Sequence, residues 1–239
     1  MQYLKTGAAK LGLKLNPRQL EQFYAYYREL VEWNQKINLT SITEFKEVQL
    51  KHFLDSLTVS LALKRPITRQ GLRLIDVGSG AGFPGLPLMI ASPFIKLVLL
   101  EATAKKAAFL YHLIQKLGLD DVEVVVGRAE EVAHKSQYRE QFDMVVSRAV
   151  APLPALIELT LPFCAVGGSV ILQKKGDIEG EVNQATKATE TLGGSQPEVK
   201  RIELAELADD RYLVIIGKIA PTPAKYPRRP GIPAKRPIV

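Results

Sequence analysis

Three closely spaced glycines form the part of the sequence best suited to bind a ligand. The stretch LIDVGSGAGFPGLPL begins at Leu74 and places Gly78, Gly80 and Gly82 directly after an apolar run that contains Asp76. Glycine-rich turns after a strand let a ligand come close to the backbone. The sequence therefore predicts a ligand site here, and the glycines alone leave the ligand open.

The spacing of this loop argues against a dinucleotide. The dinucleotide fingerprint reads G-x-G-x-x-G, and Phe83 stands where its third glycine belongs. Glu101 ends the next apolar run about twenty residues later, where a carboxylate can accept hydrogen bonds from the two ribose hydroxyls of a nucleoside. A nucleoside-containing ligand is favoured, and a tight turn without a ligand is the alternative.

The residues of this site need a sheet to position them. Short β-rich runs alternate with helical stretches, and near-continuous apolar strands with helical crossovers predict a parallel sheet covered on both faces. In such a sheet the ligand lies at the carboxyl ends of the strands. We expect strands over 73–77, 96–101, 122–126, 142–147 and 168–173, helices over 84–91, 105–119, 130–139 and 152–163, and an antiparallel edge over 198–202 and 211–217.

The first third of the chain is predicted to be helical. Asn16-Pro17 is typical of a helix cap followed by proline at the first helical position, and a second helical stretch runs over 44–63 until Arg65-Pro66 ends it. We therefore divide the chain into an N-terminal helical extension (1–70), a sheet domain (71–220) and a basic, proline-rich tail (221–239).

Composition places the chain among ordinary globular proteins. Its 239 residues are 46% hydrophobic and 24% charged, and the single cysteine, Cys164, excludes an internal disulfide. The most apolar stretch, 83–100, is interrupted by three prolines and a lysine, so we expect no membrane span. The N-terminus lacks an apolar core of signal-peptide type, and we expect a cytoplasmic protein.

The net charge of +7 suggests a polyanionic partner, and the tail concentrates this charge. Its prolines are expected to prevent a helix or a central strand, which predicts an extended basic arm that binds nucleic acid. A solvated, disordered tail is the alternative. The candidate RNA-binding residues are Arg228, Arg229, Lys235 and Arg236.

Several motifs in order resemble a known family. DVGSGAGFPGLPL, LLEATAKKAAFL, VVVGRAEE and VVSRAVAPL are similar to the motifs of class I S-adenosylmethionine-dependent methyltransferases. Together with WNQKINLTSI, HFLDSL and YPRRPGIPAKRP, they resemble the RsmG (GidB) family, which methylates guanine N7 in 16S ribosomal RNA. The resemblance covers nearly the whole chain and implies a Rossmann-like α/β fold, S-adenosyl-L-methionine as the cofactor and 16S rRNA or the 30S subunit as the partner.

The resemblance also implies roles for single residues. The glycine loop with Phe83 would approach the methionine part of the cofactor, residues 101–103 would hold ribose and adenosine, and Arg148 would complete the site. Arg148 is also our candidate catalytic residue; whether it contacts cofactor, phosphate or guanine stays open. The implied cofactor-binding set is Gly78, Gly80, Phe83, Glu101, Ala102, Thr103, Ala129, Glu130 and Arg148.

Methylation of guanine N7 places few demands on side chains. The nitrogen lone pair can attack the methyl carbon without loss of a proton, so positioning replaces a general base. Cys164 lies in an apolar segment and is expected in the core, and SRAVAPLP differs from the NPPY-like signature of exocyclic amine methylation. His52 and Asp55 are expected to form a structural pair, and we expect neither a metal nor a partner subunit.

These expectations have competitors and a first test. The chain could instead methylate a small molecule or a protein, bind nucleic acid with a vestigial pocket, or be a nicotinamide-dependent oxidoreductase, which the loop spacing disfavours. For the RNA enzyme, replacement of Arg228 and Arg229 by alanine is expected to weaken RNA methylation and to leave cofactor binding intact. The sequence does not distinguish naked rRNA from an assembled subunit.

Overall fold

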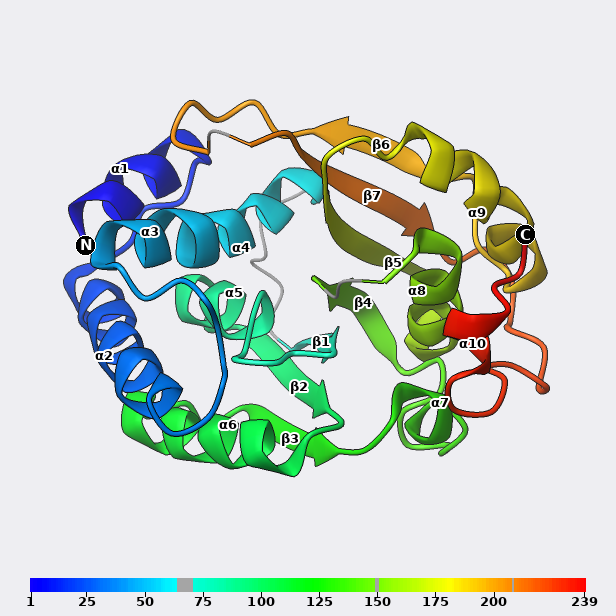
Figure 1. Cartoon of the computed structure of the whole chain (residues 1–239), viewed down its shortest axis with the longest axis horizontal. Coiled ribbons are helices and arrows are strands. Elements are labelled where there is room, and N and C mark those ends of the chain that lie inside the picture. Colours follow the sequence, from blue (N-terminus) through cyan, green and yellow to red (C-terminus); the bar gives the residue numbers. More distant parts are fainter. Residues whose placement is uncertain (64–70, 149–150, 208) are drawn as a thin grey trace.

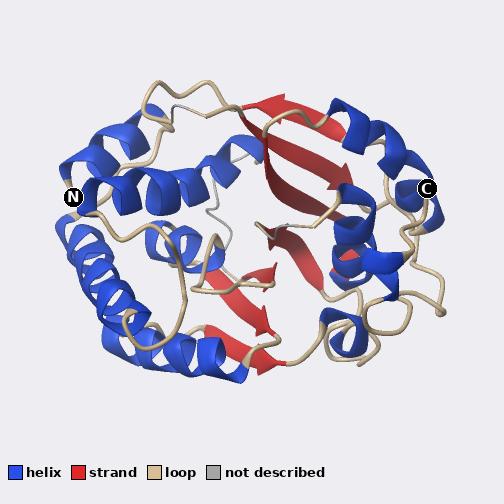
Figure 2. Cartoon of the chain, in the orientation of Figure 1, coloured by secondary structure: helices blue, strands red, loops and turns tan. Residues whose placement is uncertain are grey.

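A computed structural model describes residues 1–63, 71–148, 151–207 and 209–239 of the chain. One seven-stranded sheet, in the order β3-β2-β1-β4-β5-β7-β6, lies between two groups of helices (Figure 2). Its strands are β1 (Leu72–Val77), β2 (Ile95–Glu101), β3 (Val122–Val126), β4 (Phe142–Ser147), β5 (Cys164–Lys175), β6 (Glu198–Arg201) and β7 (Arg211–Gly217).

The sheet is parallel from β3 to β5, and β7 is antiparallel to both β5 and β6. Neighbouring residues of a strand point to opposite faces, so Leu74 packs into one apolar core and Ile75 into the other. Burial on both faces explains why the strands are almost continuously apolar. The predicted Rossmann-like sheet with antiparallel strands near the C-terminus is confirmed.

The helices form two groups, one on each face of the sheet (Figure 1). The N-terminal helices pack with α5 and α6 in one core that contains Phe23, Phe53, Leu86 and Phe109. This group comprises α1 (Gln2–Lys10), α2 (Pro17–Asn34), α3 (Phe45–Val48), α4 (Asp55–Leu57), α5 (Gly85–Ala91) and α6 (Ala104–Leu117). The other group comprises α7 (Ala129–Val132), α8 (Leu153–Thr160), α9 (Glu179–Thr191) and α10 (Ile232–Lys235).

The predicted N-terminal helices are present. The Asn16 side chain accepts from the Gln19 backbone N–H at 2.9 Å, and the Gln19 side chain accepts from the Asn16 N–H at 2.8 Å, so a capping box begins α2. The expected second stretch is a continuous run of α3, a π-helical turn (Gln49–Leu54), α4 and a 3-10 turn (Thr58–Ala62). Arg65-Pro66, expected to end it, lies outside the described residues.

Three helices, α1, α9 and α10, lie outside the expected helical ranges, and one helix is shorter than expected. In α9 the residues fully buried against the sheet include Ala185 and Ala188, and α1 buries Leu4, Gly7 and Ala8, so small residues replace the large apolar ones that mark a helix. Of the stretch expected over 130–139, only residues 130–132 are helical; together with Ala129 they form α7, and turns follow.

The apolar stretch over 83–100 contains α5 and most of β2, as its prolines indicated. Within the described ranges, no helix is long and apolar enough to cross a membrane. The N-terminal helices share a core with the sheet, and the three-part division of the chain stays a prediction.

Candidate functional site

The glycine loop follows β1 and turns over the carboxyl ends of β1 and β2. Gly78, Gly80 and Gly82 have φ angles of 74°, 58° and 93°, in the left-handed region that favours glycine. The N–H groups of Gly78 and Ser79 donate to the Leu100 carbonyl oxygen at 2.9 and 3.1 Å. These bonds tie the loop to β2 and hold its backbone at the sheet edge.

Glu101 fixes this loop from the end of β2. Its buried carboxylate accepts from the Gly80 N–H at 2.9 Å and from the Thr103 N–H at 2.8 Å. Each carboxylate oxygen has a second lone pair, so both oxygens retain capacity to accept from ribose hydroxyls. Two backbone bonds thus orient the group that the sequence assigned to the ribose.

Asp76 supports the loop from below. One carboxylate oxygen accepts from the Gly85 N–H at 2.9 Å, and the other, Oδ1, has no partner among the described residues. Burial raises the pKa of Asp76 to about 7. A Cβ at Gly85 would lie 3.0 Å from the Asp76 side chain, so the close approach of α5 to β1 favours glycine.

A cavity of about 240 Å³, the small cavity, opens at the ends of the first three strands. Its inner wall is made by Val77 and Gly78 after β1, by Leu100 and Ala102 after β2, and by Ala129 and Glu130 in α7. Its opposite wall is made by Leu156, Leu159, Gly231 and Ala234. Backbone and small or apolar side chains therefore dominate its surface.

The cofactor-binding residues expected from the sequence fall into two groups. Gly78, Ala102, Ala129 and Glu130 line the small cavity. Gly80 and Thr103 act through Glu101, whose carboxylate they orient. Phe83 and Arg148 form the second group and lie together beside the N-terminal helices.

Phe83 is buried in a stack of rings. Its ring lies 4.7 Å from the His52 ring and 5.2 Å from the Tyr26 ring, both nearly parallel to it. The Arg148 guanidinium lies 4.8 Å from the Phe83 ring centroid, a cation–π contact. Tyr26 also donates to the Ala81 carbonyl oxygen at 2.5 Å, so α2 holds the glycine loop directly.

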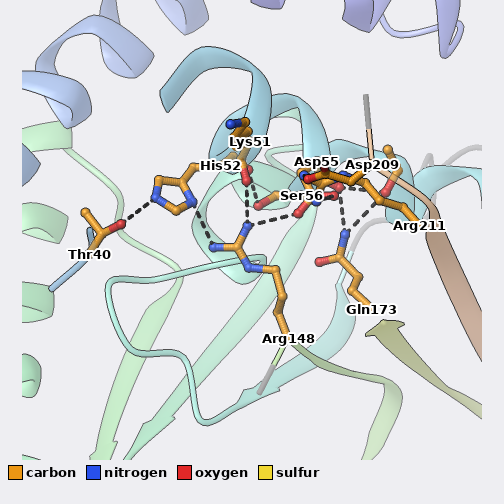
Figure 3. Close-up of polar contacts among 10 residues, drawn as sticks. Thr40, Lys51, His52, Asp55, Ser56, Arg148, Gln173, Asp209 and Arg211 are labelled. Carbon is orange, nitrogen blue, oxygen red and sulfur yellow. Dashed lines mark hydrogen bonds and ion pairs between the residues drawn. The ribbon is translucent and has the colours of Figure 1, made fainter. Parts of the chain in front are cut away.

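Arg148 joins the end of β4 to the N-terminal helices (Figure 3). Its guanidinium contacts Asp55 Oδ2 at 3.1 Å, the Lys51 carbonyl oxygen at 3.2 Å and His52 Nδ1 at 3.3 Å. Asp55 Oδ1 in turn pairs with Arg211 at 2.6 Å. The buried Asp55 carboxylate therefore holds two arginines in place.

His52 is neutral in this environment. Burial, followed by the charges of Arg148, Lys175 and Arg211, lowers the pKa of His52 to about 3. Nδ1 accepts from Arg148, and Nε2 lies 2.8 Å from Thr40 Oγ1, so both ring nitrogens have partners. His52 and Asp55 are thus both tied to Arg148, in agreement with the expected structural role.

Cys164 is also structural. It is fully buried at the start of β5, and burial raises the pKa of its thiol to about 12. A thiol held in this form is a poor nucleophile. Its expected place in the core is confirmed.

A larger cavity of about 470 Å³, the large cavity, adjoins the Arg148 cluster. Charged and polar side chains dominate its wall, including Lys51, His52, Asp55, Arg148, Lys175 and Arg211. Lys174, also in the wall, pairs with Glu181 at 2.7 Å. Burial and the neighbouring Arg211 lower the pKa of Lys175, as expected for a site where positive charge accumulates.

Arg211 and Gln173 were missed by the sequence reasoning. Gln173 donates to the Asp55 carbonyl oxygen at 2.7 Å, and Arg211 holds the Asp55 carboxylate. The signal was present, because β7 was expected to be antiparallel. The first residue of an antiparallel strand lies at the carboxyl edge of its parallel neighbours, which places Arg211 at the site.

The C-terminal segment corrects the expectation of an extended arm. It folds back on α7 and α8 and contains the short helix α10, in which Pro233 is tolerated because it stands in the first turn. Arg228 forms a bidentate ion pair with the buried carboxylate of Glu158, with contacts from 2.6 to 3.1 Å. Arg229, Lys235 and Arg236 are exposed, and their RNA contact stays a prediction.

The donor set of the small cavity fits one end of S-adenosyl-L-methionine. Apolar walls suit the flat adenine, and the Glu101 carboxylate beside the cavity suits the ribose. The cavity of about 240 Å³ is smaller than the about 300–1,000 Å³ of sites that enclose a drug-sized ligand, so it has room for part of such a cofactor. No group of residues suited to hold a metal ion occurs within the described part of the chain.

Comparisons with known proteins agree with this geometry. The family model described as rRNA small subunit methyltransferase G (GidB) matches residues 19–209. The chain is 54% identical over 239 residues to "Ribosomal RNA small subunit methyltransferase G" of Dehalococcoides mccartyi, covering 100% of each chain. It is 49% identical over 232 residues to the protein of that name from Roseiflexus castenholzii, covering 97% of each.

Solved structures share the fold. A SAM-dependent O-methyltransferase from Thermotoga maritima has a TM-score of 0.53 at 18% identity and covers 81% of this chain and 72% of its own. A precorrin-6y C5,15-methyltransferase from Geobacter metallireducens has a TM-score of 0.50 at 16% identity, over 76% and 91%. The long match of the family model and the full-length relatives show that the chain belongs to the GidB family, rRNA small subunit methyltransferase G.

Proposed function

We propose that this chain transfers the methyl group of S-adenosyl-L-methionine to N7 of a guanine in 16S rRNA of the small ribosomal subunit. One observation carries the proposal beyond family membership. A small cavity suited to a nucleoside and a large cavity with a cationic wall adjoin the same edge of the sheet; Ser147 at the end of β4 lines the first and the next residue, Arg148, lines the second. One region suits the cofactor and the other suits RNA.

The cofactor, when bound, supplies an electrophilic methyl group. Gly78, Ala102, Ala129 and Glu130 would enclose its adenosyl end, and Glu101 would accept from the ribose hydroxyls. The loop backbone would lie along the methionine part. Each of these groups is fixed by hydrogen bonds or by the sheet, which is the requirement for catalysis by positioning.

The reaction at N7 requires no proton acceptor, and the structure is compatible with that requirement. His52 has partners at both ring nitrogens, and Asp55 pairs with two arginines. Neither side chain is free to act as a general base. Catalysis then consists of holding nitrogen, carbon and sulfur in line and excluding water.

Arg148 is the proposed catalytic residue because it lines the large cavity and directly follows Ser147, which lines the small cavity. Its guanidinium packs on the ring of Phe83, which belongs to the glycine loop, and it also lines the large cavity. It could therefore hold the loop in place and contact the substrate. The contact with Asp55 fixes its orientation. Replacement by lysine would keep the charge and lose the planar fork.

Ribosomal RNA would reach the site across exposed cations. Lys175 lines the large cavity, and Arg229, Lys235 and Arg236 are exposed on the C-terminal segment. N7 faces the deep, narrow major groove of A-form RNA, so the target base must lie in a loop or be splayed out. We further propose that the enzyme acts as a monomer in the cytoplasm and that residues 1–70, 71–220 and 221–239 form its three parts.

The test uses methyl-labelled S-adenosylmethionine with unmodified 30S subunits and with naked 16S rRNA. Chemical cleavage at 7-methylguanosine should reveal a new site in at least one substrate. Arg148→Ala should lower the yield strongly, and Arg18→Ala, an exposed arginine on α2, should not. Label transfer without cleavage would place the methyl group elsewhere than N7, and no transfer to either substrate would refute the proposal.

A further inference from the structure

The C-terminal segment, residues 221–236, is anchored by several side chains that precede it by about 70 residues or more. The Arg139 guanidinium donates to the carbonyl oxygens of Thr222 at 2.8 Å and Tyr226 at 2.9 Å. The His134 ring contacts the Pro227 carbonyl oxygen at 2.8 Å. The segment is therefore fixed on the turns after α7, although no strand or long helix holds it.

Arg228 supplies the strongest anchor. Its side chain pairs with both carboxylate oxygens of Glu158, and its backbone N–H donates to the same carboxylate at 2.8 Å. Glu158 is fully buried in α8. A buried carboxylate without its partner is costly, so this pair fixes the segment against α8.

Beyond this anchor the chain turns over the small cavity. The Gly231 N–H donates to Glu130 Oε1 at 2.9 Å, and its φ of 81° permits the turn that begins α10. Gly231 and Ala234 line the cavity opposite Gly78 and Ala102. The C-terminal segment thus faces the glycine loop across the same space.

We propose that residues 228–234 form the outer wall of the cofactor site and hold the adenosyl end of S-adenosyl-L-methionine. The inference rests on the proposed function, because it requires that the small cavity binds this cofactor. Arg228 acts as a positioning residue through Glu158, and Gly231 and Ala234 supply contact surface. Without this wall the adenosyl group would have strand ends on one side and solvent on the other.

The outward side of the wall explains why its sequence looks like an RNA-binding arm. Arg229, Lys235 and Arg236 are exposed, whereas Arg228 lies inward on its carboxylate partner. One short segment therefore combines cofactor contacts with exposed positive charge. The basic composition alone does not distinguish these two uses.

The test measures binding of S-adenosylhomocysteine to the full-length protein by calorimetry. Ala234→Trp would add an indole to the outer wall of the small cavity, and we expect at least a tenfold weaker affinity. Ala224→Trp is the matched control, because Ala224 is an exposed alanine of the same segment outside the cavity wall. The control should bind within twofold of the parent.

A second pair of variants tests the anchor. Because Arg228 is bound to Glu158, Arg228→Ala should weaken cofactor binding severalfold, which replaces the sequence-based expectation of intact binding; Lys225→Ala, which removes an exposed cation three residues earlier, should not weaken it. Thermal unfolding of each variant reports whether it folds; if Arg228→Ala fails to fold, the Ala234→Trp result decides. Equal affinity of Ala234→Trp and the parent would overturn the wall, whereas a parent that binds no S-adenosylhomocysteine would overturn the proposed function itself.

Discussion

The two cavities at the carboxyl edge of the sheet differ in how their walls are made. Glycine, alanine and leucine form most of the small cavity, and its Glu130 is already bonded to the Gly231 N–H. Lysine, arginine, histidine and aspartate form half of the residues that line the large cavity, where one carboxylate pairs with two arginines. In the proposed function, the small cavity would select a ligand by shape and the large cavity by charge.

This difference predicts which substitutions impair each cavity. A cavity that selects by shape loses affinity when a larger side chain enters it, since the backbone and small residues of its wall have no room to move. A charge-selective wall fails when one ion loses its partner, because a buried unpaired charge is costly. Substitutions at the two cavities should therefore differ in whether they reduce mainly affinity or mainly stability.

The largest expected effect is on the large cavity. Asp55→Ala would leave the buried Arg211 and the largely buried Arg148 without their shared carboxylate, and the free energy of unfolding should fall by about 3 kcal/mol or more. Urea unfolding measures the change. Asp210→Ala breaks the exposed pair with Arg201 and should cost less than about 1 kcal/mol. Similar losses in both variants would show that the cluster adds no special stability.

The next effect concerns the small cavity. Gly78→Val would put a branched side chain at a φ of 74° on the cavity wall, and cofactor affinity should fall about 100-fold, which is about 2.7 kcal/mol. Calorimetry with S-adenosylhomocysteine measures this loss. Gly118→Val imposes a similar backbone strain at the end of α6, in open space away from the cavity. It should lower stability and leave affinity unchanged.

Asp76, beneath the glycine loop, gives a pH-dependent prediction. Its pKa is raised to about 7 in the folded protein, so its contribution to stability is present below the unfolded pKa of about 3.9 and is lost as pH rises toward 7. The free energy of unfolding should fall by about 1 kcal/mol per pH unit between pH 5 and 7 from this group. Asp76→Asn should flatten that part of the profile; an unchanged slope would mean that Asp76 is ionised throughout.

The smallest effect probes the exposed charge of the large cavity. Lys175→Ala should weaken rRNA binding severalfold and reduce the slope of log affinity against log salt by about 1. Filter binding at several salt concentrations measures both quantities. Lys187→Ala, an exposed lysine on α9 outside both cavity walls, is the control. If Lys175→Ala and the parent protein have the same slope of log affinity against log salt, Lys175 does not contact the RNA.

The pattern of apolar residues along the chain predicted the sheet, but it did not predict contacts between residues that are far apart in the sequence. The strands β1 to β5 can be recognised as apolar runs because a strand buried on both faces requires apolar residues. The glycine loop can be recognised because left-handed backbone favours glycine. The partner of Arg228 lies 70 residues away in α8, and proline-rich basic composition does not reveal it. A folded segment therefore looked like an extended arm.

The group of charged residues around Asp55 was predicted only in part, for a similar reason. Arg148 follows β4 at the expected edge, and HFLDSL supplied His52 and Asp55. Their common attachment depends on how α4 packs against β5 and β7, which helical periodicity does not specify. Arg211 could have been placed there from the antiparallel direction of β7.

The position of the proposed wall late in the chain implies an order of assembly. Synthesis runs from the N-terminus, and folding can begin before it is complete. Every strand that the structure describes is made by Gly217, whereas Arg228 and Ala234 follow. A nascent chain can thus complete its sheet and glycine loop and still lack the closing contact. In the proposed function, the nascent chain would therefore reach its full affinity for the cofactor only after residues 228–234 have been made and have packed against α8.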